Sequence, residues 1–287
     1  IYAELTGVKV SASSVWGTLQ ELGERVLQLE CANKLDLGVR QDEKITVEKD
    51  AGVSMDGLFV NIRDESWKEL KVGCVFTFCA KAGLKPNKEG GLIQEVKANS
   101  QTYVSHLGGP EGIGMKVENE TQRRGWSRAR QKAVVGDGAS WIWKQAELYF
   151  PDSAHIVDWY HAKQHLAAAA DNFYANQPEE KRDWLEIASN RLYNGQAKLI
   201  ARQLRKGPCP QDAGYFDENH ERMQYHDFQS SALPIGSGTI EAAAKMYQGR
   251  LAATGMRWSR NGLQHILPFR DSILSSRFDA LWKLLCP

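Results

Sequence analysis

Residues 133–143, with the sequence AVVGDGASWIW, predict a buried strand, a turn and a helix in quick succession. The apolar run Ala133–Val135 has the character of a short buried strand, and Gly136-Asp137-Gly138 ends it. A helix is expected through residues 141–150, and a second short strand at Ala154–Val157 leads into a further helix. Two strands joined by a crossover helix run parallel, so this part of the chain predicts a parallel pair.

Upstream of this unit the sequence predicts three antiparallel strands. Residues 53–63 and 67–78 are β-rich runs separated by a short turn, and residues 102–107 are a third candidate strand. A helix over 113–131 then leads back to the strand at 133–135. The fold class is therefore α/β, with a mixed five-stranded sheet in the spatial order 3-2-1-4-5 and flanking helices.

The remainder of the chain is predicted to be helical. Residues 166–206 are rich in Ala, Leu, Lys and Arg, and Pro208 and Pro210 interrupt them. This stretch is interpreted as a helical insertion between the fifth strand and the last helices. After it, the expected helices cover residues 213–228, a stretch from about 239 that follows the turn-rich LPIGSG, and 261–274.

The N-terminal segment is a candidate remnant of a helix-turn-helix, because residues 5–25 favour a short helix pair. An ordinary surface hairpin is the alternative. Residues 41–49 are polar and charged and are interpreted as a linker. The expected units are an N-terminal segment with linker (1–50), the first part of the core (51–165), the helical insertion (166–231) and C-terminal helices that complete the core (232–287).

Composition excludes several classes of protein. The 287 residues carry a net charge of +1 and are 42% hydrophobic, as expected of a globular protein rather than a disordered or wholly basic one. The longest uncharged apolar stretch, Val72–Ala80, is far shorter than the roughly 20 residues of a membrane span. No secretion signal opens the chain, and five cysteines without a C-x-x-C favour a reducing compartment. Because Ile1 rather than Met comes first, we expect a processed protein or part of a longer one.

Three carboxylates are singled out by their positions. Asp56 lies within the first expected strand, Asp137 follows the fourth, and Glu241 is in the first turn of the helix after LPIGSG. Strands one and four are neighbours in the expected order, so Asp56 and Asp137 should lie side by side. A helix packed across them would deliver Glu241. Clustered carboxylates repel one another unless a hard cation such as Mg²⁺ neutralises them.

Each carboxylate also has a plainer explanation. For Asp56, a structural role and a functional role are equally expected. An Asp between two glycines, such as Asp137, is often a turn residue. Glu241 could instead pair with Lys245 at i,i+4 on the helix surface. A capping box does not explain Glu241, because that motif places the acid three residues after Ser or Thr. Ser237 and Thr239 stand four and two residues before it. The three acids together, in this order, favour a metal site.

Several longer motifs bear on the family. They are VSMDG, VVGDGASWIW, FPDSAHIVDWYHAKQHL, LPIGSGTIEAAAK and GMRWSRNG, and they extend from about Ala51 to Arg270. With these motifs in this order, the chain resembles the transposases of bacterial insertion sequences of the ISKra type. Those are DDE enzymes with an RNase H-like catalytic core. The resemblance implies that Asp56, Asp137 and Glu241 form the catalytic and metal-binding triad.

The resemblance also implies a mechanism and partners. Two Mg²⁺ ions, with Mn²⁺ as a substitute, would serve hydrolysis at the transposon end and then strand transfer into target DNA. Asp56 would bridge the two ions, with Asp137 and Glu241 completing one site each. The partners implied are transposon-end DNA, target DNA and further copies of the chain bound to DNA. The implied location is the bacterial cytoplasm, at the nucleoid, with no membrane.

Asp158-Trp159-Tyr160-His161 matches the Asp/Cys-x-x-His signature of mutator-like and hAT transposases. Asp158 and His161 are expected to brace the site from behind, and contact of His161 with the scissile phosphate is the alternative. His161 and His165 also have the i,i+4 spacing of a zinc pair, but the sequence places no third ligand.

Two basic stretches are candidate DNA-binding surfaces, because Lys and Arg pair with phosphates. Residues 121–132 carry five basic residues and no acid, and residues 242–277 carry a basic surplus after Glu241. Trp258 is a candidate for stacking on an unpaired base, with burial as the alternative. The expected contacts are Arg123, Arg124, Arg128, Arg130, Lys132, Lys245, Arg250, Arg257, Trp258 and Arg260.

Other functions remain open at the level of sequence. One is a catalytically inactive, transposase-derived DNA-binding protein. Another is a metal-dependent nuclease of the same fold, and a third is a glycosidase with paired carboxylates, whose activity would survive chelation.

Overall fold

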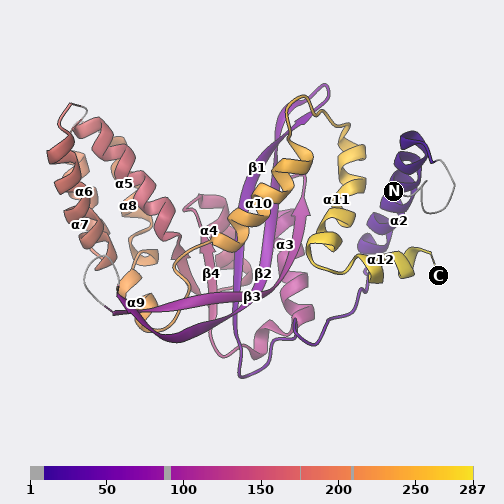
Figure 1. Cartoon of the computed structure of the whole chain (residues 1–287), viewed down its shortest axis with the longest axis horizontal. Coiled ribbons are helices and arrows are strands. Elements are labelled where there is room, and N and C mark those ends of the chain that lie inside the picture. Colours follow the sequence, from indigo (N-terminus) through magenta and orange to yellow (C-terminus); the bar gives the residue numbers. More distant parts are fainter. Residues whose placement is uncertain (1–9, 87–91, 175, 208–209, 287) are drawn as a thin grey trace.

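A computed structural model describes residues 10–86, 92–174, 176–207 and 210–286 of the chain. The centre of the fold is a five-stranded mixed sheet in the order β3-β2-β1-β4-β5 (Figure 1). β1 pairs antiparallel with β2, and β2 with β3, whereas β1, β4 and β5 are parallel. The predicted mixed sheet and its strand order are confirmed. The strands are β1 (Asp50–Ile62), β2 (Ser66–Pro86), β3 (Leu92–His106), β4 (Lys132–Gly136) and β5 (Ala154–Val157).

β2 and β3 are longer than the sequence predicts. Strands were expected at 67–78 and 102–107, but β2 continues to Pro86 and β3 begins at Leu92. The extra part is rich in polar side chains, such as the Lys81–Glu95 pair at 2.8 Å, and lacks the alternation that identifies a half-buried strand. This hairpin arm reaches toward the helical insertion, where β3 contacts α9 (Tyr225–Ser230) (Figure 1).

Helices cover both faces of the sheet. Side chains alternate along β1, so Val53 and Met55 pack on one face while Leu58 and Val60 pack on the other. On the first face lie α3 (Pro110–Arg124) and α4 (Ser140–Tyr149), and on the second lie α10 (Gly238–Leu251) and α11 (Arg260–Leu274). The face to which a strand residue points therefore decides which helices its side chain meets.

The helix before β4 is shorter than predicted. It was expected over 113–131, but α3 ends at Arg124 because Gly125 adopts the left-handed conformation with φ +93°. A 3₁₀ turn (Trp126–Arg128) follows, and Trp126 is buried against Phe150. Gly125 thus turns the chain away from the helix axis before β4 enters the sheet.

Between β5 and α10 the chain forms a group of helices, drawn together at one end of Figure 1. The long stretch expected to be helical over 166–206 is divided among three helices, and α5 already begins at Trp159. Aromatic contacts such as Trp159–Tyr225 and Phe173–Trp184 hold the group together. Its helices are α5 (Trp159–Phe173), α6 (Pro178–Tyr193), α7 (Ala197–Lys206), α8 (Ala213–Glu218) and α9, with 3₁₀ turns at Pro210–Asp212 and His220–Arg222.

The N-terminal segment differs from the expected helix pair. From residue 10 onward it is one helix, α2 (Ala12–Cys31), capped by Ser11 and packed against α11 and α12 (Phe278–Leu285). Residues 1–9, which include the start of the predicted pair, lie outside the described residues. Among those described, no helix combines the length and apolarity needed to cross a bilayer.

Residues 41–49, interpreted as a linker, enter the core. Glu43 and Ile45 are both fully buried. The carboxylate of Glu43 accepts hydrogen bonds from Arg277, and Arg277 also bonds to Glu120 at 3.1 Å. These charges satisfy one another in the interior, so the polar sequence of this segment marks a buried ion network rather than a solvated connection.

Candidate active site

Asp56 and Asp137 lie side by side on neighbouring parallel strands. The β1–β4 ladder pairs Val53 with Val134 and Ser54 with Val135, and Ser54 Oγ donates to the Val135 carbonyl at 2.7 Å. Two residues further along each strand, the same register brings Asp56 level with Asp137. Side-chain alternation directs both toward the face covered by α10. The predicted adjacency of these two acids therefore follows from the register.

Backbone amides orient both carboxylates. Asp56 Oδ1 accepts from the Gly57 amide at 2.7 Å, and Asp137 Oδ1 accepts from the Ala139 amide at 2.8 Å. Burial raises the pKa of Asp56 to about 6, and the charges of Asp137 and Glu241 add to the increase. The carboxylates are thus close enough to oppose one another's ionisation, which is the condition that a bound cation relieves.

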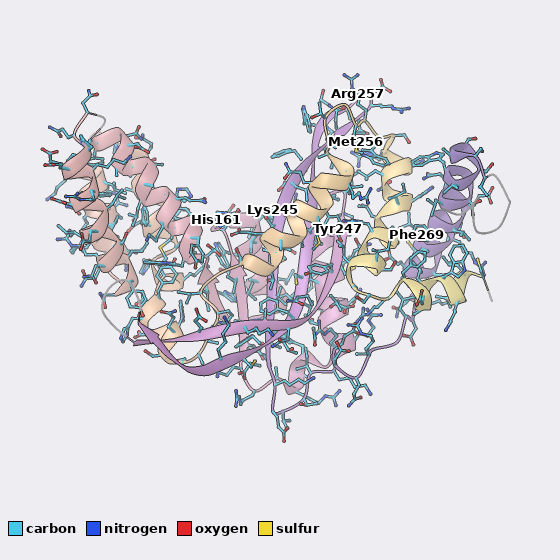
Figure 2. The ribbon with its side chains drawn as sticks, viewed as in Figure 1. His161, Lys245, Tyr247, Met256, Arg257 and Phe269 are labelled. Atoms are coloured by element: carbon cyan, nitrogen blue, oxygen red, sulfur yellow. The ribbon has the colours of Figure 1, made fainter. Side chains whose placement is uncertain are left out.

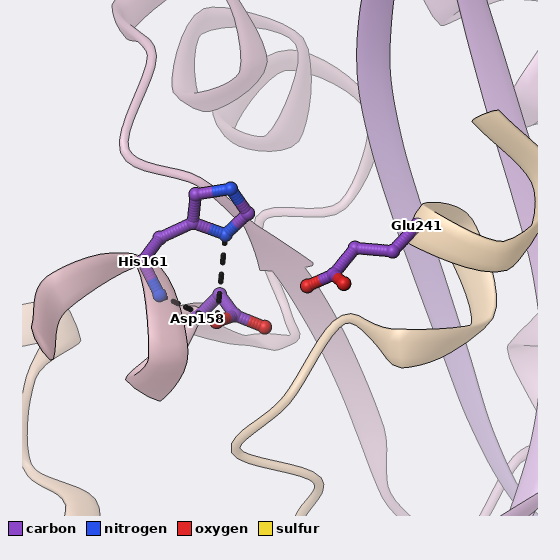
Figure 3. Close-up of side chains that lie close together, drawn as sticks. All are labelled: Asp158, His161 and Glu241. Atoms are coloured by element: carbon purple, nitrogen blue, oxygen red, sulfur yellow. Dashed lines mark hydrogen bonds and ion pairs between the residues drawn. The ribbon is translucent and has the colours of Figure 1, made fainter. Parts of the chain in front are cut away.

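Glu241 reaches the same face from the first turn of α10. Its backbone amide donates to the Ser237 carbonyl at 3.1 Å, so the turn at Ser237 sets where the side chain begins. Glu241, Asp158 and His161 each offer a ligand atom, and these three atoms lie within 4.8 Å of one another (Figure 3). Among the described residues, that group does not include Asp56 or Asp137. Glu241 thus belongs to a close three-residue group with Asp158 and His161, and the three predicted acids do not form such a group among the described residues.

Asp158 fastens the Glu241-bearing segment to the sheet. It is fully buried at the end of β5, where Oδ1 accepts from the His161 amide at 2.9 Å and Oδ2 accepts from the Ser237 amide. Next to it, the Trp159 amide donates to the Ile235 carbonyl at 2.8 Å. Burial opposes ionisation of Asp158, but the hydrogen bonds from His161 and Ser237 outweigh it and lower the pKa. These contacts tie the end of β5 to the turn before α10, and the bracing role expected from sequence stays a prediction.

His161 is the counter-charge of this cluster. Its Nδ1 lies 3.5 Å from Asp158 Oδ1 (Figure 3). The interaction with Asp158 raises the pKa of His161 against the opposing effect of burial, and the charges of Asp137 and Glu241 act in the same direction. An imidazolium here offsets part of the negative charge of the surrounding acids.

His165 does not join His161 in a zinc pair. Its ring stacks on Tyr215 of α8 with the ring centroids 3.6 Å apart, and burial lowers its pKa. Of the two histidines, His161 alone belongs to the group of ligand atoms found among the described residues.

Tyr215 was missed by the sequence interpretation. Its hydroxyl donates to the backbone carbonyl of Asp137 at 2.9 Å, so the helical insertion directly contacts the turn that carries Asp137. Gly138 has φ +106°, and a β-carbon there would lie 2.5 Å from the Tyr215 ring. Gly138 is therefore required both for the turn and for the close approach of Tyr215. No short-range pattern links residues so far apart in the chain.

The first basic stretch lies at the wrong end of β4 for the site. It precedes β4, whereas Asp137 follows it, and most of its members are engaged: Arg123 with Glu120, Arg130 with Asp50 and Lys132 with Asp152. Arg128 is exposed. These residues, predicted to contact DNA, therefore lie at the opposite end of β4 from Asp137.

Arg124 is a core residue, and the prediction that it contacts DNA is wrong. Its side chain is 1% exposed. The guanidinium donates to the carbonyls of Glu43 and Val75 at 2.9 and 2.6 Å and to Thr102 Oγ1 at 2.8 Å. A side chain held in this way is inaccessible to a phosphate.

The second basic stretch follows Glu241 along α10. Lys245, Arg250 and Arg257 are exposed, and Figure 2 shows Lys245 on α10 and Arg257 beyond the far end of that helix. Arg260 is bound to Glu65 by two hydrogen bonds, one of them at 2.9 Å.

Trp258 has a structural role in place of the predicted base stacking. Its indole donates to the Leu251 carbonyl at 2.7 Å, its ring lies against Trp16, and its backbone bridges to Ile62. A partly buried ring that is fixed by these contacts is not free to stack on a base.

Three carboxylates, from the middle of β1, the turn after β4 and the first turn of α10, face the same side of the sheet, and carboxylate oxygens are the ligands that hard divalent cations prefer. Burial is the main cause of the raised pKa of Asp56, and the nearby charges of Asp137 and Glu241 contribute to it. No protein-family model matches this chain, and no curated protein matches it either.

Replacing Asp158 by Ala is expected to loosen the Glu241 segment. Two buried amides, of His161 and Ser237, would be left without their acceptor, at a cost of about 2–4 kcal/mol in unfolding free energy. Asp158→Asn should cost less, because its amide oxygen still accepts from one of them. Urea unfolding of both variants checks this. An Asp158→Ala protein as stable as the parent would show that the carboxylate does not hold the segment.

Proposed function

We propose that this chain is the catalytic part of a DNA transposase with an RNase H-like core, related to those of ISKra-type insertion sequences. The proposal rests chiefly on one observation: Asp56 and Asp137 stand level on adjacent parallel strands, in surroundings that raise the pKa of Asp56 to about 6. Glu241 approaches from α10 on the same face. These are the three acids that the resemblance implies.

Asp56, Asp137 and Glu241 would together hold two Mg²⁺ ions. Such ions, when bound, activate an attacking oxygen and stabilise the leaving oxygen of a phosphodiester. Asp158 and His161 would hold the start of α10 next to the carboxylates. Tyr215 would hold the Asp137 turn from the insertion.

The substrate is DNA, attacked twice. Water first opens a phosphodiester at the transposon end and frees a 3′-hydroxyl, which then attacks a phosphodiester of the target strand. Both steps displace an oxygen at phosphorus, so one set of carboxylates serves both. A nuclease of the same fold would perform the first step alone, and detection of joined products distinguishes the two.

Crystals soaked in Mn²⁺ test the site by anomalous diffraction. We expect a peak bounded by Asp56 and Asp137, with Glu241 turned toward it, and none in crystals of Asp56→Asn. A single peak held by Asp158, His161 and Glu241, with none at the strand ends, would contradict the triad.

Metal binding is expected to depend on pH through Asp56. Protons compete with the cation for a carboxylate whose pKa is about 6, so Mn²⁺ should raise the melting temperature more at pH 7.5 than at pH 5. Differential scanning fluorimetry with and without chelator measures the two shifts. Equal shifts at both pH values would argue against a site that contains Asp56.

A further inference from the structure

A segment close to the C-terminus lies alongside the end of β1, next to the turn between β1 and β2. The Trp258 amide donates to the Asn61 carbonyl at 3.0 Å, and the Arg63 amide donates to the Trp258 carbonyl at 2.8 Å. These bonds place residues 257 and 258 alongside the end of β1. Arg257 and Arg63, remote in sequence, are thereby brought to one place.

A hollow of about 590 Å³ lies at this junction. Its lining holds two arginines, one acid and two neutral polar side chains, from Asn61, Ile62, Arg63, Asp64, Ser66 and Arg257. Both arginines are exposed, and neither forms an ion pair with a residue that the structure describes. Nearby Arg260, by contrast, is occupied by Glu65. The hollow therefore presents two available guanidinium groups against the single carboxylate of Asp64.

An exposed aromatic residue directly follows one of the lining residues in sequence. Trp67 is 58% exposed, follows the lining residue Ser66 and pairs across the hairpin with Asn61. Guanidinium groups beside an exposed indole are typical of nucleic-acid-binding surfaces, where the cations meet phosphates and the ring packs on sugar or base. Charge and composition thus favour a polyanion over a small neutral ligand.

The hollow stands at a fixed distance from the carboxylates. Ile62 is six residues beyond Asp56 on the same strand, which corresponds to about 20 Å at 3.3 Å per residue. Along the axis of duplex DNA, base pairs repeat every 3.4 Å or so, so a reach of about 20 Å along that axis corresponds to about six nucleotides. Exposed Lys245 and Arg250 of α10 lie on the helix that connects the two places.

We propose that Arg63 and Arg257 form a binding site for the phosphodiester backbone of duplex DNA, about six nucleotides from the bond that is cut. The site rests on the proposed function for the identity of its ligand. It supplies affinity and alignment and takes no part in the chemistry, because neither arginine is near the strand-end acids. Arg63 was not among the contacts predicted from sequence.

The test is the salt dependence of binding to a labelled 30-base-pair duplex, measured by fluorescence anisotropy in EDTA. The double variant Arg63→Ala/Arg257→Ala should bind at least tenfold more weakly at low salt. It should also lower the slope of log K against log salt by about 2, one for each phosphate that is no longer neutralised. The matched control is Arg182→Ala/Lys283→Ala, two exposed basic residues on α6 and α12, which should leave the slope unchanged. Arg63→Lys/Arg257→Lys should retain most of the slope.

A double variant with the parent's affinity and slope would overturn the site, as would a parent protein that does not bind the duplex. Unchanged melting temperatures show that the variants are folded. Metal-dependent cleavage of supercoiled plasmid, measured on the same proteins, separates the two proposals. A reduced slope without any cleavage by the parent would keep the DNA site and reject the transposase, and cleavage with an unchanged slope would do the reverse.

Discussion

Asp56→Asn and Asp137→Asn should each abolish metal-dependent DNA cleavage, and Asp56→Asn should make the metal-free protein more stable. The carboxylates supply the negative charge that holds the cation, and an amide does not. The same charge disfavours the folded protein when no cation is present. Loss of activity with a gain in stability is the expected signature of an acid kept for function.

The stability gain of Asp56→Asn has a defined pH window. Folding raises the pKa of this acid from 3.8 to about 6, so the ionised form is disfavoured in the folded state. The penalty is absent below about pH 4, grows between 4 and 6, and is complete above 6, where it reaches up to about 3 kcal/mol. Urea unfolding in EDTA at pH 4, 6 and 8 should therefore show a gain only at the two higher values.

Asp183→Asn is the matched control, because this acid is 65% exposed on α6 of the insertion. It should change neither cleavage nor stability by a measurable amount. Full cleavage by Asp56→Asn or Asp137→Asn would remove that residue from the triad. A destabilised Asp56→Asn at pH 8 would show that the carboxylate is needed structurally.

Arg277→Met should destabilise the protein by about 3–5 kcal/mol, because it removes the buried cation that Glu43 and Glu120 share and leaves them with only Arg40 and Arg123, respectively. The side chain of Arg277 is 5% exposed, and its bonds to these two acids join the segment before β1, helix α3 and the start of α12. Chemical denaturation at pH 7 measures the loss.

The double variant Arg277→Met/Glu43→Leu distinguishes two causes of the loss of stability. One is the lost ion-pair attraction, and the other is the cost of a buried carboxylate left without its cation. It removes the more buried acid together with the cation, so it should recover part of the loss, while Glu120 keeps Arg123 as a partner. Arg182→Ala, at an exposed position, should stay within about 0.5 kcal/mol of the parent. If Arg277→Met were destabilised by less than about 1 kcal/mol, the network would contribute little to folding.

The sheet order and the adjacency of Asp56 and Asp137 could be predicted because their signals are local. Short apolar runs identify β4 and β5, a glycine-flanked Asp137 marks where β4 ends, and parallel pairing brings Asp56 level with it. Each of these inferences needs only neighbouring residues and the rules of strand connection.

Other features depend on contacts that sequence spacing does not reveal. Arg124 resembles any basic residue at a helix end, and only the packing of α3 shows that it is buried. Tyr215 meets Asp137 across 78 residues of chain. The placing of Glu241 beside Asp158 and His161 depends on the turn at Ser237, whose geometry is set by a bond to a strand end. Long-range polar contacts of this kind have no periodic signature.

The helical insertion leaves the sheet at Asp158 and returns at Ser237, 79 residues later, and one hydrogen bond joins these two positions. The two ends of the insertion are therefore joined to each other where the insertion leaves the sheet. The position of Ser237, and with it the start of the helix that carries Glu241, is therefore set at the sheet and does not depend on the length of chain between the two positions. The bond from Tyr215 to Asp137 is a second tie between the insertion and the sheet.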